Sequence, residues 1–227
     1  MNTVGIIGGM GPEATVLLMQ KVIAAVAAQD DADHIPLIVH QNPAVPSRIR
    51  RLIEGSGDDP APVLAQMARD LAAAGAQALA MPCNTAHAYA PQIIAATRLP
   101  FLDMRDASLV HLRGILAPGA RVGMLASPAV RMARVFEAPF AAAGLVPVFL
   151  PDDTAILALI RRVKAGDAGA ASLAEMSKIA QSLATTCDHM LVACTELSLL
   201  TAVLEGMAWT DTLDCLTDSI VQFARRV

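Results

Sequence analysis

ALAMPCNT (residues 78–85) and MLVACT (residues 190–195) are two short apolar runs, and each ends in a cysteine with a threonine close behind it. Short apolar runs of this kind indicate buried strands, and a longer amphipathic segment follows each of them. Alternation of this type is typical of βα units around a parallel sheet. The two segments therefore predict an α/β fold with one cysteine at the end of a strand in each half of the chain.

The likeness between the halves extends to their beginnings. VGIIGG (residues 4–9) opens the first half, and RVGMLAS (residues 121–127) opens the second. Because the order and spacing are nearly kept, we expect two similar Rossmann-like or flavodoxin-like domains with parallel sheets, related by internal pseudo-symmetry around a central cleft. The predicted boundaries are residues 1–102 plus 208–227 for the first domain and residues 103–207 for the second. The alternative is that any two parallel strands look alike.

The same alternation places the individual elements. Expected strands span residues 4–8, 36–40, 77–81 and 100–103 in the first half, and 121–126, 146–150 and 189–193 in the second. Expected helices span residues 12–28, 61–74, 85–97, 131–143, 154–164, 170–186 and 195–205, and a last one begins near residue 210.

Composition excludes several classes of protein. The chain has 227 residues, 55% of them apolar and 17% charged, which suits two compact cores and excludes disorder. A net charge of −4 without a long basic run argues against a nucleic-acid partner. The longest stretch without Asp, Glu, Lys or Arg, residues 71–97, is broken by Gly75, Pro82 and Pro91, so no membrane span is expected. The N-terminus does not resemble a signal peptide, and the four cysteines lack CxxC or zinc spacing, which predicts a cytoplasmic chain with free thiols and no metal.

Cys83 and Cys194 hold the positions at which parallel α/β sheets bind ligands, outside the carboxyl ends of strands. Both precede predicted helices, whose N-termini should lower the pKa of a thiol. Asn84, Thr85 and Thr195 add hydrogen-bonding groups to the same turns. If the halves face one another, two thiols flank a cleft, and one can remove a proton from a carbon while the other donates one to its opposite face. The alternative is that they are core thiols, as we expect for Cys187 and Cys215.

A glycine-rich loop, GGMGPEAT (residues 8–15), connects the first strand to the first helix. Part of it satisfies the dinucleotide pattern G-x-G-x-x-A, but the second strand ends in His40-Gln41-Asn42 rather than in an acidic residue. Backbone N–H groups in such a loop also suit a small carboxylate. Both interpretations remain open from the residues alone, with the carboxylate favoured.

GIIGGMGPEAT (residues 5–15), MPCNTAH (residues 81–87) and ACTEL (residues 193–197) together resemble the aspartate/glutamate racemase family, in particular its aspartate racemase branch. The resemblance spans nearly the whole chain in the right order. It implies two Rossmann-like domains with the active site between them, a homodimer, and amino-acid racemisation without pyridoxal phosphate or another cofactor. Carried over to this chain, the two thiols that act as bases are Cys83 and Cys194.

The resemblance also implies substrate-binding residues. Arg48 follows a segment similar to the family's Asn-x-x-x-Pro-Asp-Arg and would bind a carboxylate, and Lys164 matches a lysine of the second domain. The alternative for both is a solvated surface charge. Met10 resembles a pocket-lining position, with core packing as its alternative, and Ser127 keeps a hydroxyl after the fifth strand. Glu196 stands where aspartate racemases have Glu and glutamate racemases typically have His.

The chain departs from the family pattern around this site. Ser47 replaces an Asp, Ile49 a Thr, Val130 a hydroxyl residue and Ser198 a common proline, and Ala129 lies in the same altered segment. These changes argue against aspartate as the sole substrate. The sequence therefore predicts an amino-acid racemase acting on aspartate, glutamate or a broader range of amino acids. Alternatives are a related isomerase or decarboxylase, a hydantoin racemase, or a catalytically silent carboxylate-binding domain.

Overall fold

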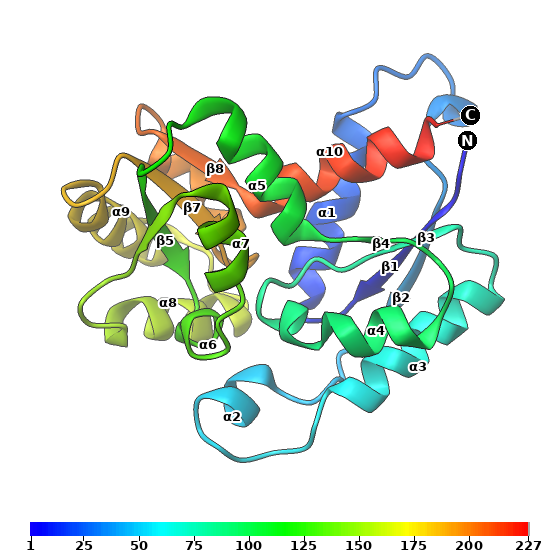
Figure 1. Cartoon of the computed structure of the whole chain (residues 1–227), viewed down its shortest axis with the longest axis horizontal. Coiled ribbons are helices and arrows are strands. Elements are labelled where there is room, and N and C mark those ends of the chain that lie inside the picture. The colour runs from blue at the N-terminus through cyan, green and yellow to red at the C-terminus, as the bar shows by residue number, and fades with distance from the viewer. Residues whose placement is uncertain (227) are drawn as a thin grey trace.

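A computed structural model describes residues 1–226 and shows two parallel sheets of four strands each (Figure 1). In the first sheet the strand order is β2-β1-β3-β4, and in the second it is β6-β5-β7-β8. The strands are β1 (Val4–Gly8), β2 (Leu37–Gln41), β3 (Ala78–Ala80), β4 (Phe101–Leu102), β5 (Arg121–Ala126), β6 (Val146–Val148), β7 (His189–Ala193) and β8 (Trp209–Asp211). Each sheet grows in the same order from its first strand, which confirms the predicted duplication of an α/β unit.

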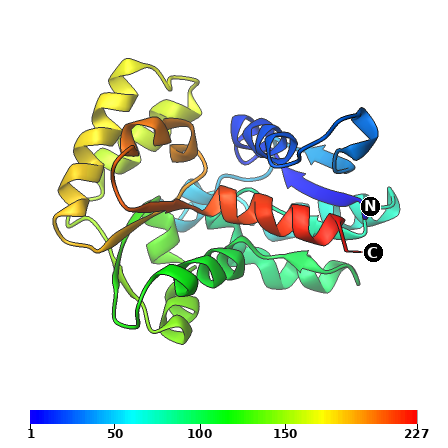
Figure 2. The ribbon, with the colours of Figure 1, turned by 90° about the horizontal axis from the view of Figure 1, so that it is seen from above.

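Helices cover both faces of each sheet (Figures 1 and 2). They are α1 (Pro12–Ala24), η1 (Asp31–Asp33), α2 (Arg48–Leu52), α3 (Ala61–Ala73), η2 (Thr85–Tyr89), α4 (Ala90–Ala96), α5 (Met104–Ile115), α6 (Pro128–Met132), α7 (Glu137–Ala143), α8 (Thr154–Lys164), α9 (Ala170–Ala184), η3 (Leu197–Leu204) and α10 (Thr212–Ala224). Within residues 1–226, none of them combines the length and the apolar composition needed to cross a bilayer.

Four apolar clusters hold these layers together. In the first sheet, α1 and α10 pack on one face and α3 and α4 on the other. In the second, α8, α9 and η3 cover one face and α5 and α7 the other. Of the central strands, β1, β3 and β7 are buried along their whole length, and β5 is buried except at Arg121. Burial on both faces is the reason why these strands appear in the sequence as unbroken apolar runs.

The last segment of the chain connects the two halves. β8 pairs with β7 in the second sheet, whereas α10 packs against α1 and α5. Figures 1 and 2 show α10 running from the second sheet to the chain ends, where the backbone N–H of Asn2 donates to the carbonyl of Ala224 (2.8 Å). The predicted return to the first domain at residue 208 precedes β8, so we propose that the return begins with α10 instead.

Several elements differ from the sequence-based expectation. The helix predicted over residues 85–97 is a 3₁₀ segment, η2, followed by α4, and the one over 195–205 is the 3₁₀ segment η3. The helix predicted over 131–143 is divided into α6 and α7 around Arg134, whose φ of 53° interrupts helical geometry. The helices α2 and α5 and the strand β8 were not predicted.

Asp211 is a buried carboxyl at the start of α10. Its Oδ1 accepts hydrogen bonds from the Ser198 hydroxyl (2.9 Å) and from the Leu213 N–H (2.8 Å), and its Oδ2 has no partner among the described residues. Burial raises the pKa of Asp211 to about 6. Between about pH 4 and 6 the carboxyl of Asp211 is therefore protonated in the folded protein and ionised in the unfolded chain. The free energy of unfolding is consequently higher at the acidic end of this window and falls as pH rises through it.

Replacing Asp211 with Asn, which does not titrate, should remove this part of the pH dependence of the free energy of unfolding. The free energy of unfolding of the parent should fall, relative to that of Asp211→Asn, by roughly 3 kcal/mol as pH rises through that window. Urea unfolding at several pH values measures the difference, and Asp218→Asn, an exposed position of the same helix, is the control. The same pH dependence in the parent and Asp211→Asn would show that Asp211 does not titrate as proposed.

Candidate active site

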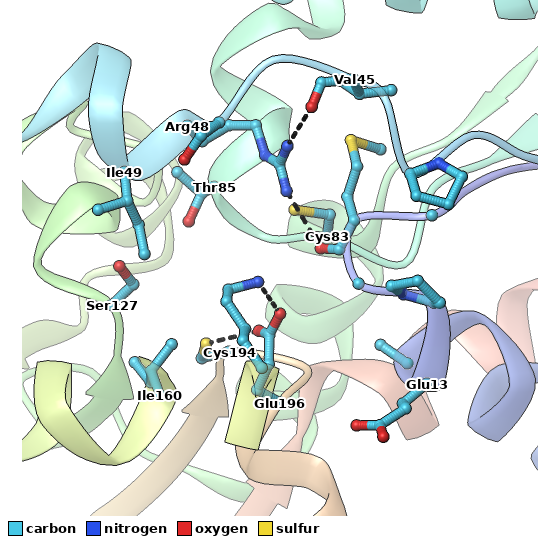
Figure 3. A pocket seen from close by; sticks show the side chains of 18 of the residues that line it. Glu13, Val45, Arg48, Ile49, Cys83, Thr85, Ser127, Ile160, Cys194 and Glu196 are labelled. Carbon is cyan, nitrogen blue, oxygen red and sulfur yellow. Dashed lines mark hydrogen bonds and ion pairs between the residues drawn. The ribbon is translucent and has the colours of Figure 1, made fainter. Parts of the chain in front are cut away.

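A cavity of about 430 Å³ lies between the two sheets, where the carboxyl ends of β1, β3, β5 and β7 meet (Figure 3). It receives side chains from both domains. Its lining comprises Gly9, Met10, Gly11, Pro12, Glu13, Ala14, Pro43, Val45, Ser47, Arg48, Ile49, Cys83, Thr85, Ser127, Ile160, Lys164, Cys194, Glu196 and Leu199. The two cysteines singled out in the sequence thus line one pocket, with Cys83 on one side and Cys194 on the other in Figure 3.

The glycine-rich loop forms one wall of this cavity. A Cβ at Gly8 would lie 2.6 Å from the Thr15 side chain, and one at Gly9, whose φ is +96°, would lie 2.5 Å from the backbone of Asn42. The Gly9 N–H donates to the Thr15 hydroxyl (2.9 Å). Only glycine allows this close packing of the loop, and the packing holds Met10 at the pocket with 2% of its surface exposed.

Arg48 begins α2 and reaches back toward the glycine-rich loop. Its Nη1 donates to the carbonyls of Pro46 (2.9 Å) and Val45 (3.3 Å), and its Nη2 donates to that of Met10 (3.5 Å). Its Nε is buried without a hydrogen-bond partner among the described residues. No described carboxylate forms an ion pair with Arg48. Arg48 lines the cavity, so its guanidinium brings an uncompensated positive charge to the pocket.

Cys83 follows β3 and is held by a buried histidine. His87 is fully enclosed, and burial lowers its pKa, so the ring is neutral. Its Nδ1 lies 2.8 Å from the Cys83 carbonyl, and its Nε2 accepts the Met104 N–H at 3.3 Å. This network assigns the Nδ1 hydrogen to the Cys83 carbonyl. His87 thus fixes the turn that carries Cys83.

Cys194 follows β7 and belongs to a chain of polar groups. Its thiol donates to Oε2 of Glu196 (3.1 Å), and the other oxygen of this carboxylate forms an ion pair with Lys164 of α8. Burial acts to lower the pKa of Lys164, but Glu196 and the two nearby thiols outweigh it and raise that pKa. Burial raises the pKa of the Cys194 thiol well above its usual range, Glu196 raises it further, and Lys164 opposes both.

The expectation that a helix N-terminus lowers the pKa is therefore wrong for Cys194. The segment after it is a 3₁₀ helix that begins only at Leu197, and its dipole does not compensate for burial beside a carboxylate. A group surrounded by protein loses the water that stabilises its charged form, and this cost exceeds the effect of one short helix. The ammonium of Lys164 is the group in this structure that lowers the pKa of Cys194.

Asn84 and Thr195 do not line the cavity, although the sequence placed them in the binding site. The Asn84 amide donates to the Thr212 hydroxyl (2.9 Å), and the Thr195 hydroxyl donates to the carbonyl of Pro82 (3.2 Å). The Thr195 bond joins the turn after β7 to the turn after β3, and the Asn84 bond joins the turn after β3 to the start of α10. These two residues thus hold the cysteine turns in place rather than face the pocket.

The remaining sequence-predicted residues, Thr85, Ser127 and Glu196, do line the cavity. Of the departures from the family pattern, Ser47 and Ile49 also line it, but Ala129, Val130 and Ser198 do not. Lining positions that the sequence did not reveal include Glu13, Ile160 and Leu199. The spacing of Ile160 and Lys164, four residues apart on α8, is the one signal that could have revealed that they share a face.

Comparison with known proteins places the chain among racemases. A family model described as Asp/Glu/Hydantoin racemase matches residues 7–220. The chain is 24% identical to the broad specificity amino-acid racemase RacX of Bacillus subtilis (strain 168) over 224 residues, 96% of each chain. Its fold is similar to that of Picrophilus torridus aspartate racemase, with a TM-score of 0.89, 24% identity and coverage of 99% of this chain and 94% of that one. Francisella tularensis glutamate racemase, solved with D-glutamate, has a TM-score of 0.67 at 12% identity, covering 98% and 80% of the two chains. Because the family model matches nearly its whole length, the chain belongs to the Asp/Glu/Hydantoin racemase family.

Proposed function

We propose that this chain is a cofactor-independent amino-acid racemase in which Cys83 and Cys194 exchange the α-proton on opposite faces of the substrate. The observation that carries the proposal is the position of the two thiols. Each follows the equivalent strand of one domain, and both line the cavity between the domains. Family membership and the curated relative RacX support the same reaction.

The proposed reaction is one proton removal and one proton delivery. The thiolate of one cysteine takes the α-proton, the electron pair of the C–H bond moves into the carboxylate-stabilised carbanion, and the thiol of the other cysteine protonates the opposite face. After one turnover the two cysteines have exchanged protonation states. The guanidinium of Arg48, which lines the cavity without a carboxylate partner among the described residues, binds the α-carboxylate, and this charge-assisted contact stabilises the negative charge that develops.

Proton exchange in D₂O tests the proposed activity. Incubation with a panel of L-amino acids, followed by NMR of the α-proton and by chiral chromatography, should show deuterium at the α-carbon together with the D-enantiomer for at least one of them. A decarboxylase would instead release carbon dioxide, and a silent binding domain would show no exchange. Either of these results would overturn the proposal.

The Glu196 carboxylate should control the pH at which Cys194 becomes a thiolate. Because its negative charge raises the pKa of Cys194, Glu196→Gln should move thiolate formation to lower pH, and Lys164→Met should move it to higher pH. Alkylation of Cys194 by iodoacetamide as a function of pH, read by peptide mass spectrometry, measures the midpoint. Glu175→Gln, which removes the partner of Lys178 on α9, should leave it unchanged.

The family resemblance also supports a homodimer that works in the cytoplasm without pyridoxal phosphate. The four free cysteines suit a reducing compartment. Light scattering on the purified protein distinguishes a dimer from a monomer, and racemisation by protein treated with a carbonyl reagent such as hydroxylamine tests independence from pyridoxal phosphate.

A further inference from the structure

We infer that the substrate carries a single carboxylate and an uncharged side chain, and that Ile49 and Ile160 select it. This inference rests on the proposed racemase function and names the class of amino acid that it acts on. Two features of the cavity carry it. One is the pairing of its charges, and the other is the chemistry of the wall that Ile49 and Ile160 form.

The charges that line the cavity leave one cation for a substrate carboxylate. Two cations and two anions line it: Arg48, Lys164, Glu13 and Glu196. Lys164 is already neutralised by Glu196, which also accepts the Cys194 thiol hydrogen. Arg48 alone has no carboxylate partner among the described residues, and its Nε lacks any hydrogen-bond acceptor. Once the α-carboxylate occupies Arg48, a second carboxylate would have to compete with Glu196 for Lys164.

The wall beside Arg48 is apolar. Ile49 follows Arg48 directly on α2, and Ile160 comes from α8 of the other domain with 0% of its surface exposed. Figure 3 shows these two side chains on the same side of the pocket as Ser127. Thr85 and Ser127 are the polar side chains labelled beside this wall in Figure 3, and the Ser127 hydroxyl already accepts the Ala129 N–H at 3.3 Å. The wall therefore offers van der Waals contact and hydroxyl groups, but no charge, to a substrate side chain.

Glu13, the remaining charge, does not alter this conclusion. It lies on the opposite side of the pocket from Ile49 and Ile160 in Figure 3 and is exposed to solvent. Water and salt screen a charge in such a place. A charged side chain directed at the isoleucine wall, of either sign, would lose hydration without gaining a partner, which is unfavourable. An aliphatic or amide side chain avoids this cost.

A matched panel of substrates tests the inference. Glutamate and glutamine have nearly the same shape and differ in charge, while norvaline and lysine compare an aliphatic with a cationic side chain. We expect kcat/KM for α-proton exchange to be at least roughly tenfold higher for glutamine than for glutamate, and for norvaline than for lysine. A preference for glutamate or lysine would overturn this inference and leave the racemase intact. Absence of exchange with every amino acid would overturn the proposed function, and this inference with it.

A charge introduced on the wall tests the role of Ile49. In Ile49→Lys, the ratio of kcat/KM for glutamate to that for glutamine should rise by roughly tenfold, because the new ammonium supplies the missing partner for a second carboxylate. Ile115→Lys makes the same change on an exposed position outside the cavity and should keep the parent's ratio. Because the ratio is measured within one variant, partial loss of folded protein cancels. Equal ratios in the two variants would show that Ile49 does not select the substrate.

Discussion

Replacing either Cys83 or Cys194 with serine should lower the rate of racemisation in both directions by roughly 10²- to 10⁴-fold, the range expected for loss of a general acid or base. Both directions should suffer because each turnover uses one cysteine as the base and the other as the acid. Serine nearly preserves size and hydrogen bonding, but its hydroxyl is a much weaker acid than a thiol. Chiral chromatography of reactions started from each enantiomer measures the loss.

The other two cysteines provide matched controls. Cys187 is partly exposed and Cys215 is buried, and neither lines the cavity. Burial raises the pKa of both thiols, that of Cys215 to about 12, so both are protonated at neutral pH. Cys187→Ser and Cys215→Ser should keep the parent's rate in folded protein. Full racemisation by either Cys83→Ser or Cys194→Ser would exclude the mechanism of two thiols.

Replacing Arg48 with leucine should reduce kcat/KM by roughly 100-fold, mainly through a higher KM. One hydrogen bond to a charged group contributes about 1.5–3 kcal/mol, and the unpaired guanidinium is positioned to make at least one to the substrate carboxylate. Steady-state kinetics on any amino acid that the protein racemises gives the two parameters separately. Leucine preserves most of the contact between the side-chain stem and the loop.

Arg50→Leu is the matched control for this prediction. Arg50 lies on the same short helix, α2, but is exposed and does not line the cavity. The same substitution there should change neither kcat nor KM. If Arg48→Leu behaved like Arg50→Leu, the carboxylate would have to bind elsewhere in the pocket, and the assignment of substrate charge to Arg48 would be wrong.

The sequence predicted the parts of the fold whose signal is local. β1, β5 and β7 were predicted to the residue because they are buried on both faces, so apart from the first residues of β5 and β7, Arg121 and His189, every residue in them is apolar or small. The turns after β3 and β7 could be recognised because each carries a cysteine that interrupts an apolar run. The joint placement of Cys83 and Cys194 at one cavity followed from the repeat of these units in two halves.

The elements that the sequence did not predict depend on tertiary contacts. β8 has only three residues and is a strand because it pairs with β7. α5 carries Arg105, Asp106, Arg113 and Gly114 among its apolar residues, so its helical pattern of apolar positions is weaker than that of α8. It is nevertheless a helix whose apolar face packs against α10 and α7. In each case the deciding partner is distant in sequence.

The same limit applies to the candidate site. Lys164 and Glu196 are far apart in the sequence, and Ile49 and Ile160 come from different domains, so no local pattern shows that they share a cavity. The direction of the pKa shift of Cys194 was wrong because it depends on burial and on the charge of Glu196. Residue types alone indicated a thiol at a strand end, but not the electrostatic environment around it.

Isotope incorporation in D₂O during the first part of a single reaction tests the central claim most directly. The product enantiomer receives its α-hydrogen from the thiol that faces it, whose hydrogen has exchanged with solvent, while the opposite thiol holds the proton taken from the substrate. We therefore predict that the early product carries deuterium at the α-carbon while the remaining substrate retains its proton. Early product that retains the substrate's proton, or substrate that gains deuterium as fast as product forms, would contradict a mechanism in which Cys83 and Cys194 act on opposite faces.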